Sequence, residues 1–324
     1  MLLPILRRLL EMLFVLFGIS VIVFAIFFAT PGADPAARIA GRNATPQQLE
    51  MVRKSFGFDK PLPIQYAKMM DKLFIEQNLT SFVNRGEKVI PEIVEAAPVT
   101  LSLVFGAAVI WVIFGIIVGM AAAATRGSWL DRTLMFLSLV GVSMPVFWVG
   151  AVMNLFTQAR WHDTIFFHWV PALGYTPLTQ DPFMWFKSLI IPWITLAILY
   201  IGLYGRVLRA NLVEAYQEDF IRTARAKGLS ETRIMLRHAL RTSLITFVSM
   251  FGLDFGALVG GGALLTEVIF NLPGVGRLTY IALQTLDLPF IMAAVMYSSF
   301  FVVVANALVD IAYSWLDPRV RDGR

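Results

Sequence analysis

Two carboxylates lie in a part of this 324-residue chain that is otherwise apolar, the stretch FGLDFGALVGGGALLTEVIF. They belong to Asp254 and Glu267. An ionisable group inside a bilayer is costly, so it usually faces a water-filled path or a partner. Both residues are therefore candidates for lining a translocation pathway. Glu267 lies near the outer end of the stretch, and solvation at the membrane interface explains it equally well.

A glycine stripe runs through the same stretch, with Gly252, Gly256 and Gly260 recurring every four residues. Such spacing places them on one helix face, where another backbone can approach closely. Gly261 and Gly262 add a point at which the helix can loosen. The pattern fits a gating element of the pathway and also fits plain helix packing, and the residue types alone do not decide between them.

Residues 211–241 form a charged helical segment between two long apolar stretches. Gly228 is suited to a left-handed helix C-cap, and Ser230 to the N-cap of a following helix with Glu231 in its first turn. Glu218 and Arg222 have the spacing of a helical ion pair. The pattern predicts a short helix, a sharp turn and a second helix that leads into a membrane span.

The same segment has an apolar repeat at i, i+4 spacing, which predicts one apolar helix face opposite a charged one. Its members are Leu212, Tyr216, Phe220 and Ala224. A segment built in this way is expected to meet a partner, although an ordinary solvated loop would also carry such caps.

Composition identifies a polytopic membrane protein, with 57% hydrophobic and only 15% charged residues and a mean hydropathy of +0.69. Soluble chains usually carry about a quarter charged residues. The net charge of +5 is therefore no sign of nucleic-acid binding. The absence of cysteine excludes disulfides, thiol nucleophiles and cysteine-ligated metals.

Motifs for other chemistry are missing. The sequence has no G-x-x-x-x-G-K-[ST], so it does not itself bind ATP phosphates in a P-loop. H-E-x-x-H and G-x-S-x-G are absent too, which gives poor support to an intramembrane protease or esterase. No metal site is expected, because His162 and His168 lie among aromatics in a loop and His238 fits a lipid-facing position beside two arginines.

Six membrane spans are expected in an all-α fold, with both chain ends in the cytoplasm because the short basic links should stay inside. A signal peptide is the competing interpretation of the first span, but its apolar run is too long for one. Pro145 and Pro192 should kink the third and fourth spans. The predicted spans are residues 9–29, 99–124, 133–157, 186–208, 243–269 and 289–314.

Residues 30–98 are expected to form a helical extracytoplasmic insertion between the first two spans, within a single domain that covers residues 1–324. Thr45-Pro46-Gln47-Gln48 has the form of a capping box with proline at the first helical position. Gly57 should end this helix, and a second helix is expected after Pro63.

The charged segment QEDFIRTARAKGLSETRIMLRHALR resembles the cytoplasmic coupling loop of permease subunits in peptide-type ABC importers. The nearest branch is the first, or B-type, membrane subunit of dipeptide and oligopeptide importers. Further stretches resemble that branch in the same order along the chain: PGADPAARIAG, FGFDKPLPIQY, GVSMPVFWVG, LLTEVIFNLPGVGRL and NALVDIAYSWLDPRVR.

The resemblance implies a permease in a bacterial cytoplasmic membrane that imports peptides and binds no cofactor itself. ATP and Mg²⁺ would be bound by two separate ATPase subunits. A related second permease and an extracytoplasmic peptide-binding protein would complete the complex, in contact with membrane lipid and with no nucleic acid. The expected ATPase-coupling residues are Glu218, Asp219, Phe220, Arg222, Thr223, Ala224, Arg225, Lys227 and Gly228.

Some positions depart from the family pattern. Of the general importer loop pattern E-A-A-x-x-x-G, only Ala224 and Gly228 are kept, which is how the peptide branch is usually written. Residues 242–246 lack the usual proline, and residues 77–81 differ from the usual G-D-L-G-x-S. An ion-coupled secondary transporter or channel, which would work without an ATPase, remains the alternative function. A membrane assembly protein without transport is a further alternative.

Overall fold

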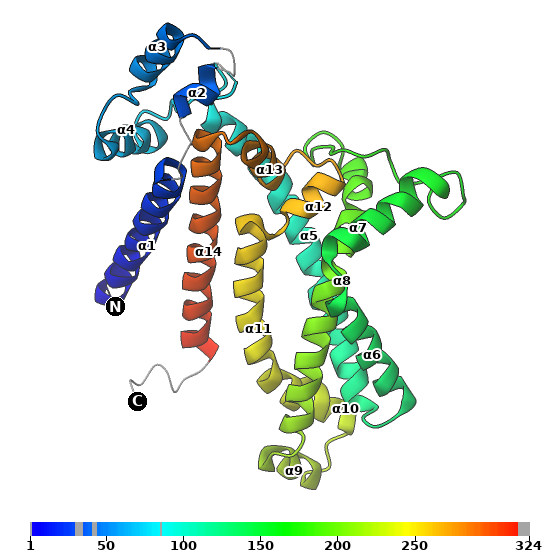
Figure 1. The fold of residues 1–324 in the computed structure, drawn as a ribbon. Coiled ribbons are helices and arrows are strands. Elements are labelled where there is room, and N and C mark those ends of the chain that lie inside the picture. The colour runs from blue at the N-terminus through cyan, green and yellow to red at the C-terminus, as the bar shows by residue number, and fades with distance from the viewer. Residues whose placement is uncertain (1, 30–34, 41–43, 85, 317–324) are drawn as a thin grey trace.

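The computed structural model describes residues 2–29, 35–40, 44–84 and 86–316 (Figure 1). Within these ranges all regular structure is helical, apart from one isolated bridge between Thr80 and Lys88. The expected all-α fold is therefore confirmed. Because a bilayer core offers no water to an unpaired backbone, helices satisfy each segment internally.

Five helical stretches are long and apolar enough to cross a membrane. The first two are in α1 (Leu2–Ala29) and α5 (Val89–Ala124). The third is α8 (Pro182–Ala215), which continues through Pro192. The fourth runs into α11 (Leu240–Ala257), and the fifth lies in α14 (Leu288–Leu316).

The predicted third span is bent by 94° between α6 (Trp129–Ser143) and α7 (Val146–Asn154). Pro145 is the N-cap of α7, and Met144 before it is extended, as steric contact with a following proline favours. A π-helical segment, Leu155–Arg160, continues α7. The described chain thus has six spans only if this bent pair is counted as one.

The predicted fifth span, residues 243–269, is wrong in its last part. A π-helical segment, Leu258–Gly262, ends α11, and Gly261 within it has φ of +121°, which an L side chain rarely adopts. The loosening expected at Gly261 and Gly262 is therefore present. Beyond it, α12 (Leu264–Ile269) is a separate short helix, and α13 (Val275–Thr285) follows.

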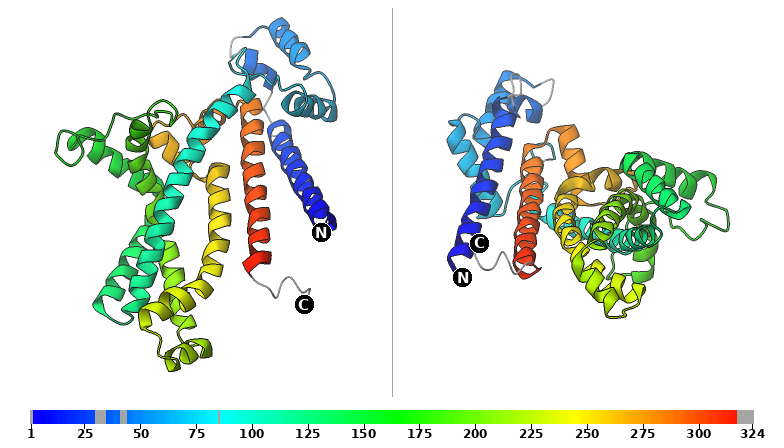
Figure 2. Two further views of the ribbon diagram at one scale, coloured as in Figure 1. Left: turned by 180° about the vertical axis from the view of Figure 1, so that it is seen from behind. Right: turned by 90° about the horizontal axis from the view of Figure 1, so that it is seen from below.

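The helices form two groups joined by α11. Helices α5, α6 and α8 pack together on one side, and α1 and α14 lie on the other, with α11 between them (Figure 2). The largest fully buried side chains, Trp111 and Tyr204, lie between α5 and α8. Glycines permit this approach, because a Cβ at Gly119 would lie 2.8 Å from the Cβ of Leu208.

The insertion forms α2 (Pro35–Ala40), α3 (Pro46–Phe56) and α4 (Leu62–Phe74) at one end of the molecule (Figure 1). The capping box expected at Thr45 is confirmed, since Gln48 N donates to Thr45 Oγ1 and the Gln48 side chain accepts from Thr45 N. Gly57 ends α3 with a left-handed φ of +74°.

The insertion is tied to the spans at two points. Tyr66 of α4 packs edge-on against Phe24 of α1 and shares a hydrogen bond with Ser20. The Asp287 carboxylate, just before α14, accepts hydrogen bonds from the Phe82 backbone and from the Ser81 hydroxyl. These ties fix the insertion over α1 and α14.

The glycine stripe packs α11 against α14. A Cβ at Gly256 would overlap the Cβ of Ala305, and one at Gly252 would overlap Val309. We therefore expect Gly256→Val to destabilise the folded chain by about 1–3 kcal/mol through overpacking. The measurement is the thermal midpoint of the purified chain in detergent.

Gly18→Val is the matched control, because Gly18 lies in α1 and a Cβ there meets no atom within 4 Å. An equal loss of thermal stability in the two variants would contradict the packing role of Gly256.

Candidate functional site

The charged segment contains two breaks, where the sequence predicted one. Helix α8 ends at Ala215, a turn follows over residues 216–218, and α9 (Asp219–Ala226) begins after Glu218. The continuous apolar face predicted through Tyr216 and Phe220 is therefore wrong. Ile221 and Ala224 form the buried side of α9 instead, while Phe220 is 41% exposed.

The turn expected at Gly228 is confirmed. Gly228 has φ of +78°, its N–H donates to Arg225 O, and Leu229 N–H donates to Ala224 O. These two bonds make a Schellman motif, which satisfies carbonyls at the end of α9. Leu229 packs against the core, so the turn is attached to the main body of the protein.

The second helix of the segment is not fixed by the N-cap that the sequence predicted. Ser230 precedes α10 (Glu231–Ile234), but its side chain makes no capping hydrogen bond. Glu231 instead accepts two hydrogen bonds from Arg225, at 2.6 and 3.1 Å. The Arg225 guanidinium also lies 5.5 Å from the centre of the Tyr216 ring. One arginine thus joins both turns of the segment.

The predicted pair between Glu218 and Arg222 does not form. Arg222 lies 3.2 Å from Asp219, one turn back, and both side chains are highly exposed. A pair of this kind contributes little to stability, since solvent screens it.

The outer surface of α9 is charged, with one aromatic side chain. Ala224 is only 5% exposed, so its side chain packs inward. The other expected coupling residues are exposed: Glu218, Asp219, Phe220, Arg222, Thr223, Arg225, Lys227 and Gly228. Helix α9 lies at the end of the molecule opposite the insertion (Figure 1).

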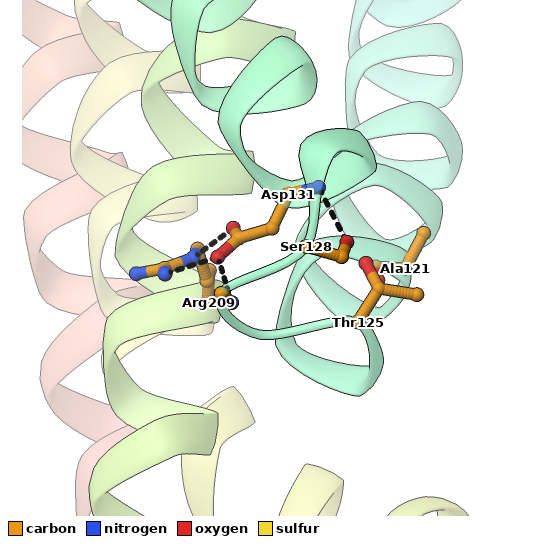
Figure 3. Close-up of polar contacts among 6 residues, drawn as sticks. Ala121, Thr125, Ser128, Asp131 and Arg209 are labelled. Atoms are coloured by element: carbon orange, nitrogen blue, oxygen red, sulfur yellow. Dashed lines mark hydrogen bonds and ion pairs between the residues drawn. The ribbon is translucent and has the colours of Figure 1, made fainter.

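A buried ion pair joins α6 to α8 above the charged segment (Figure 3). Arg209 donates to both carboxylate oxygens of Asp131, at 2.6 and 2.7 Å. Asp131 is 3% exposed, and its carboxylate also accepts from Gly127 N at 2.9 Å. Ser128 caps the start of α6 through Asp131 N. The loop between α5 and α6 is thereby fixed to α8.

Neither Asp131 nor Arg209 is among the residues predicted from the sequence to form a site. A signal was present, because Ser128 lies three residues before Asp131 at the start of a helix, and Arg209 is a cation at the end of an apolar span. Nothing local indicated that these two would meet, since 78 residues separate them.

Glu267 is fully enclosed, so solvation at the interface does not explain it. Thr100 of α5 donates to one carboxylate oxygen at 2.6 Å, and Arg277 N donates to the other at 2.9 Å. Thr100 Oγ1 accepts in turn from Val275 N. Gly274 provides the space that the Glu267 carboxylate occupies, because a Cβ at this position would overlap it. Glu267 holds α12 and the start of α13 against α5.

Asp254 lies on the face of α11 that meets α8. Its carboxylate accepts a hydrogen bond of 2.6 Å from the hydroxyl of Tyr204, which is fully buried. Asp254 itself is partly exposed. The glycine stripe lies on a different face, against α14. The five predicted pathway residues therefore do not form one cluster.

No group of three or more His, Cys, Asp or Glu side chains in the described ranges could hold a metal ion. His162 lies beside the Thr157 carbonyl, with its Nδ1 at 3.0 Å.

The sequence matches two families along most of its length. Residues 1–104 match the N-terminal part of a binding-protein-dependent transport system membrane component. Residues 115–322 match the family described as binding-protein-dependent transport system inner membrane component.

Individual proteins show the same likeness. A chain from Brucella abortus (strain 2308), whose name assigns it to a peptide transport system as a permease, is 37% identical over 98% of both chains. A glutathione transport system permease protein of Salmonella paratyphi A is 35% identical, again over 98% of both. An inward-facing structure of a methionine ABC transporter has a TM-score of 0.53 at 16% identity, covering 70% of this chain and 97% of that one, and this likeness concerns the fold alone.

Breaking the pair between Asp131 and Arg209 should destabilise the chain, because each single change leaves the other charge unpaired at a mostly buried site. We expect Asp131→Ala to cost about 2–3 kcal/mol, less than a fully buried pair would, since Arg209 is partly solvated. The measurement is the thermal midpoint in detergent.

Lys54→Ala provides the control, because Lys54 pairs with Glu50 at 2.9 Å on the exposed surface of α3. It should cost less than about 0.5 kcal/mol. Equal effects of the two changes would show that the Asp131 pair has no special role in stability.

Proposed function

Because the chain belongs to the family of binding-protein-dependent transport system inner membrane components, we propose that it is a permease subunit of an ABC importer for di- or oligopeptides. Its place is the bacterial cytoplasmic membrane. The peptide substrate is inferred from similar proteins whose names refer to peptide, dipeptide and glutathione transport.

One observation supports the coupling role most strongly, the exposed helix α9 held between two fixed turns. Its outward face is charged and carries an exposed aromatic residue, Phe220. Its inward face packs through Ile221, which is fully buried. A helix that packs against the protein on one face and is exposed on the other can be displaced by a bound partner and stay helical.

We infer that this partner is an ATPase subunit, since the sequence itself contains no P-loop. Two ATPases would bind ATP and Mg²⁺, and a second permease would complete the membrane part. An extracytoplasmic binding protein would deliver the peptide on the side of the insertion, residues 30–98.

This arrangement requires α9 and both chain ends to lie in the cytoplasm. The start of α1, the end of α14 and α9 all point away from the insertion (Figure 1). Six spans would result if α6 and α7 form one bent span.

Motion of α9 has two covalently continuous routes into the membrane. One passes through the Schellman turn and α10 into α11, and the other passes back through the turn at residues 216–218 into α8. The ion pair between Arg209 and Asp131 would carry the second movement to α6. We propose that Asp254 faces the pathway, whereas Glu267 and the glycine stripe set the positions of the segments that open and close it.

An ion-coupled secondary transporter is the second candidate, and one observation favours it: among the residues that the structure describes, the Asp254 carboxylate in a predicted span has no cationic partner and accepts one hydrogen bond, from Tyr204. Such a protein would work without an ATPase. Whether ATPases accompany the chain therefore separates the two functions.

The test is affinity purification of the chain from its native host membranes in mild detergent, followed by quantification of bound ATPase subunits. The double change Arg222→Glu and Lys227→Glu reverses two exposed charges, one on α9 and one directly after its last residue, without touching its buried side. We expect at least about a tenfold loss of ATPase from this variant, because close charge pairs at an interface contribute more than ~1.4 kcal/mol.

Lys54→Glu with Lys72→Glu makes the same change in net charge on the insertion, where both lysines are exposed, and should leave the ATPase bound. Retention by the α9 variant would contradict its role as the docking helix. Absence of ATPase from the wild type would favour the secondary transporter.

A further inference from the structure

Asp254 is a carboxylate without a cation near the end of α11, three residues before its last residue and inside a stretch that is long and apolar enough to cross a membrane. It lies 14 residues after the start of α11, which corresponds to about 21 Å along the axis. No ion pair joins it to any residue that the structure describes, and its single hydrogen bond comes from the neutral hydroxyl of Tyr204. A charge at this depth is normally matched by a partner or by a water-filled path.

One oxygen of this carboxylate is left open. Tyr204 donates to Oδ2, and no described residue donates to Oδ1. The side chain is partly exposed, whereas Asp131 and Glu267 are almost completely buried and have donors on both oxygens. Asp131 and Glu267 are therefore saturated by contacts within the protein, whereas Asp254 can accept a further hydrogen bond from a ligand.

Tyr204, whose hydroxyl donates to Asp254, belongs to a cluster of aromatic side chains from α5, α8 and α11. Tyr200 stacks on Trp111 at 4.7 Å, and Trp111 lies 5.7 Å from Phe251. Phe251 in turn lies 5.6 Å from Phe255, the residue next to Asp254. The faces of such rings attract cations, and more strongly where water is excluded.

We propose that Asp254, with the partly exposed rings of Tyr200, Phe251 and Phe255 in the same cluster, binds the primary ammonium group of a peptide as it passes through the permease. The proposal rests on the proposed function and adds the chemical class that the pathway recognises. A carboxylate with one open oxygen accepts an N⁺–H hydrogen bond, and the neighbouring rings favour a cation over an anion.

The ammonium can come from a peptide N-terminus or from a lysine side chain, since both present three donors on a compact charge. The binding protein outside would meet the peptide first. A second contact inside the membrane would favour entry of the positively charged end, and the Tyr204 hydroxyl would hold the carboxylate toward it.

The chain contains no cysteine, so a single introduced thiol reports on this position alone. Ala257→Cys places the thiol one helical turn after Asp254, at an exposed residue of α11. The full chain, purified with its bound partners and without the binding protein, is treated with a small thiol reagent. The mass of this chain then gives the rate of labelling.

Three synthetic peptides serve as protecting ligands at millimolar concentration. Trialanine has a free N-terminus, N-acetyl-Ala-Lys-Ala amide has only a side-chain ammonium, and N-acetyl-trialanine amide has neither. We expect the first, the second or both to slow labelling, and this identifies the source of the ammonium. The uncharged peptide should have no effect.

Asp254→Asn in the same background should reduce the protecting affinity by at least about tenfold, since it removes the anion that pairs with the ammonium. Asp254→Glu should restore part of it. Tyr204→Phe removes the hydrogen bond and keeps the carboxylate, so it should retain most of the protection. If Asp254 served only to hold Tyr204 in place, Tyr204→Phe and Asp254→Asn would reduce the affinity of the protecting peptide equally. That result would overturn the proposal.

Equal protection by all three peptides, protection by none, or protection by Na⁺ alone would each contradict an ammonium site. These outcomes are separate from the ATPase test. If ATPase is bound but peptides with an ammonium group do not slow labelling, the importer function is supported and the ammonium site is contradicted. If such peptides slow labelling but no ATPase is bound, the ammonium site is supported and the importer function is contradicted.

Discussion

The close approach of α5 and α8 supports the rest of this structure. A chain that crosses a bilayer gains little from burying apolar side chains against one another, because lipid is equally apolar, so helices associate through tight packing and polar contacts. Here small residues provide the packing. Gly115 leaves room for Tyr204, and Gly119 for Leu208, so that Trp111 and Tyr204 become fully buried between the two helices. Asp131 and Glu267 contact this pair directly, and Asp254 accepts its hydrogen bond from Tyr204 of α8.

Polar contacts then attach the other elements to the central pair. Asp131 joins α6 to α8, and Glu267 joins the outer segment of α12 and α13 to α5. In both cases each carboxylate oxygen has a donor, as the high cost of an unsatisfied buried charge requires. Asp254 alone departs from this pattern, which is why the same type of residue suggests packing at two positions and ligand binding at the third.

The charged segment depends on the same attachment. Helix α9 would be a marginal helix by itself, since eight residues are too few for stability in water. It is kept in place by Ile221 in the core, by the Schellman turn at Gly228 and by the contacts of Arg225 with Glu231 and Tyr216. A short helix held at both ends moves as a unit with α8 and α11, and such rigidity is what a mechanical connection to an ATPase would need.

The sequence by itself determined the features that depend on neighbouring residues. Apolar runs of sufficient length predicted the membrane helices, the capping box predicted the start of α3, Gly228 predicted its turn, and the order of family motifs predicted the permease. Tertiary structure decided which charges meet. Asp131 pairs with Arg209, and Glu267 becomes enclosed by Thr100 and the 274–277 backbone. Caps and helix periods are fixed within a few residues, whereas the partner of a buried charge is set by which helices pack together, and that depends on contacts between residues far apart in the chain.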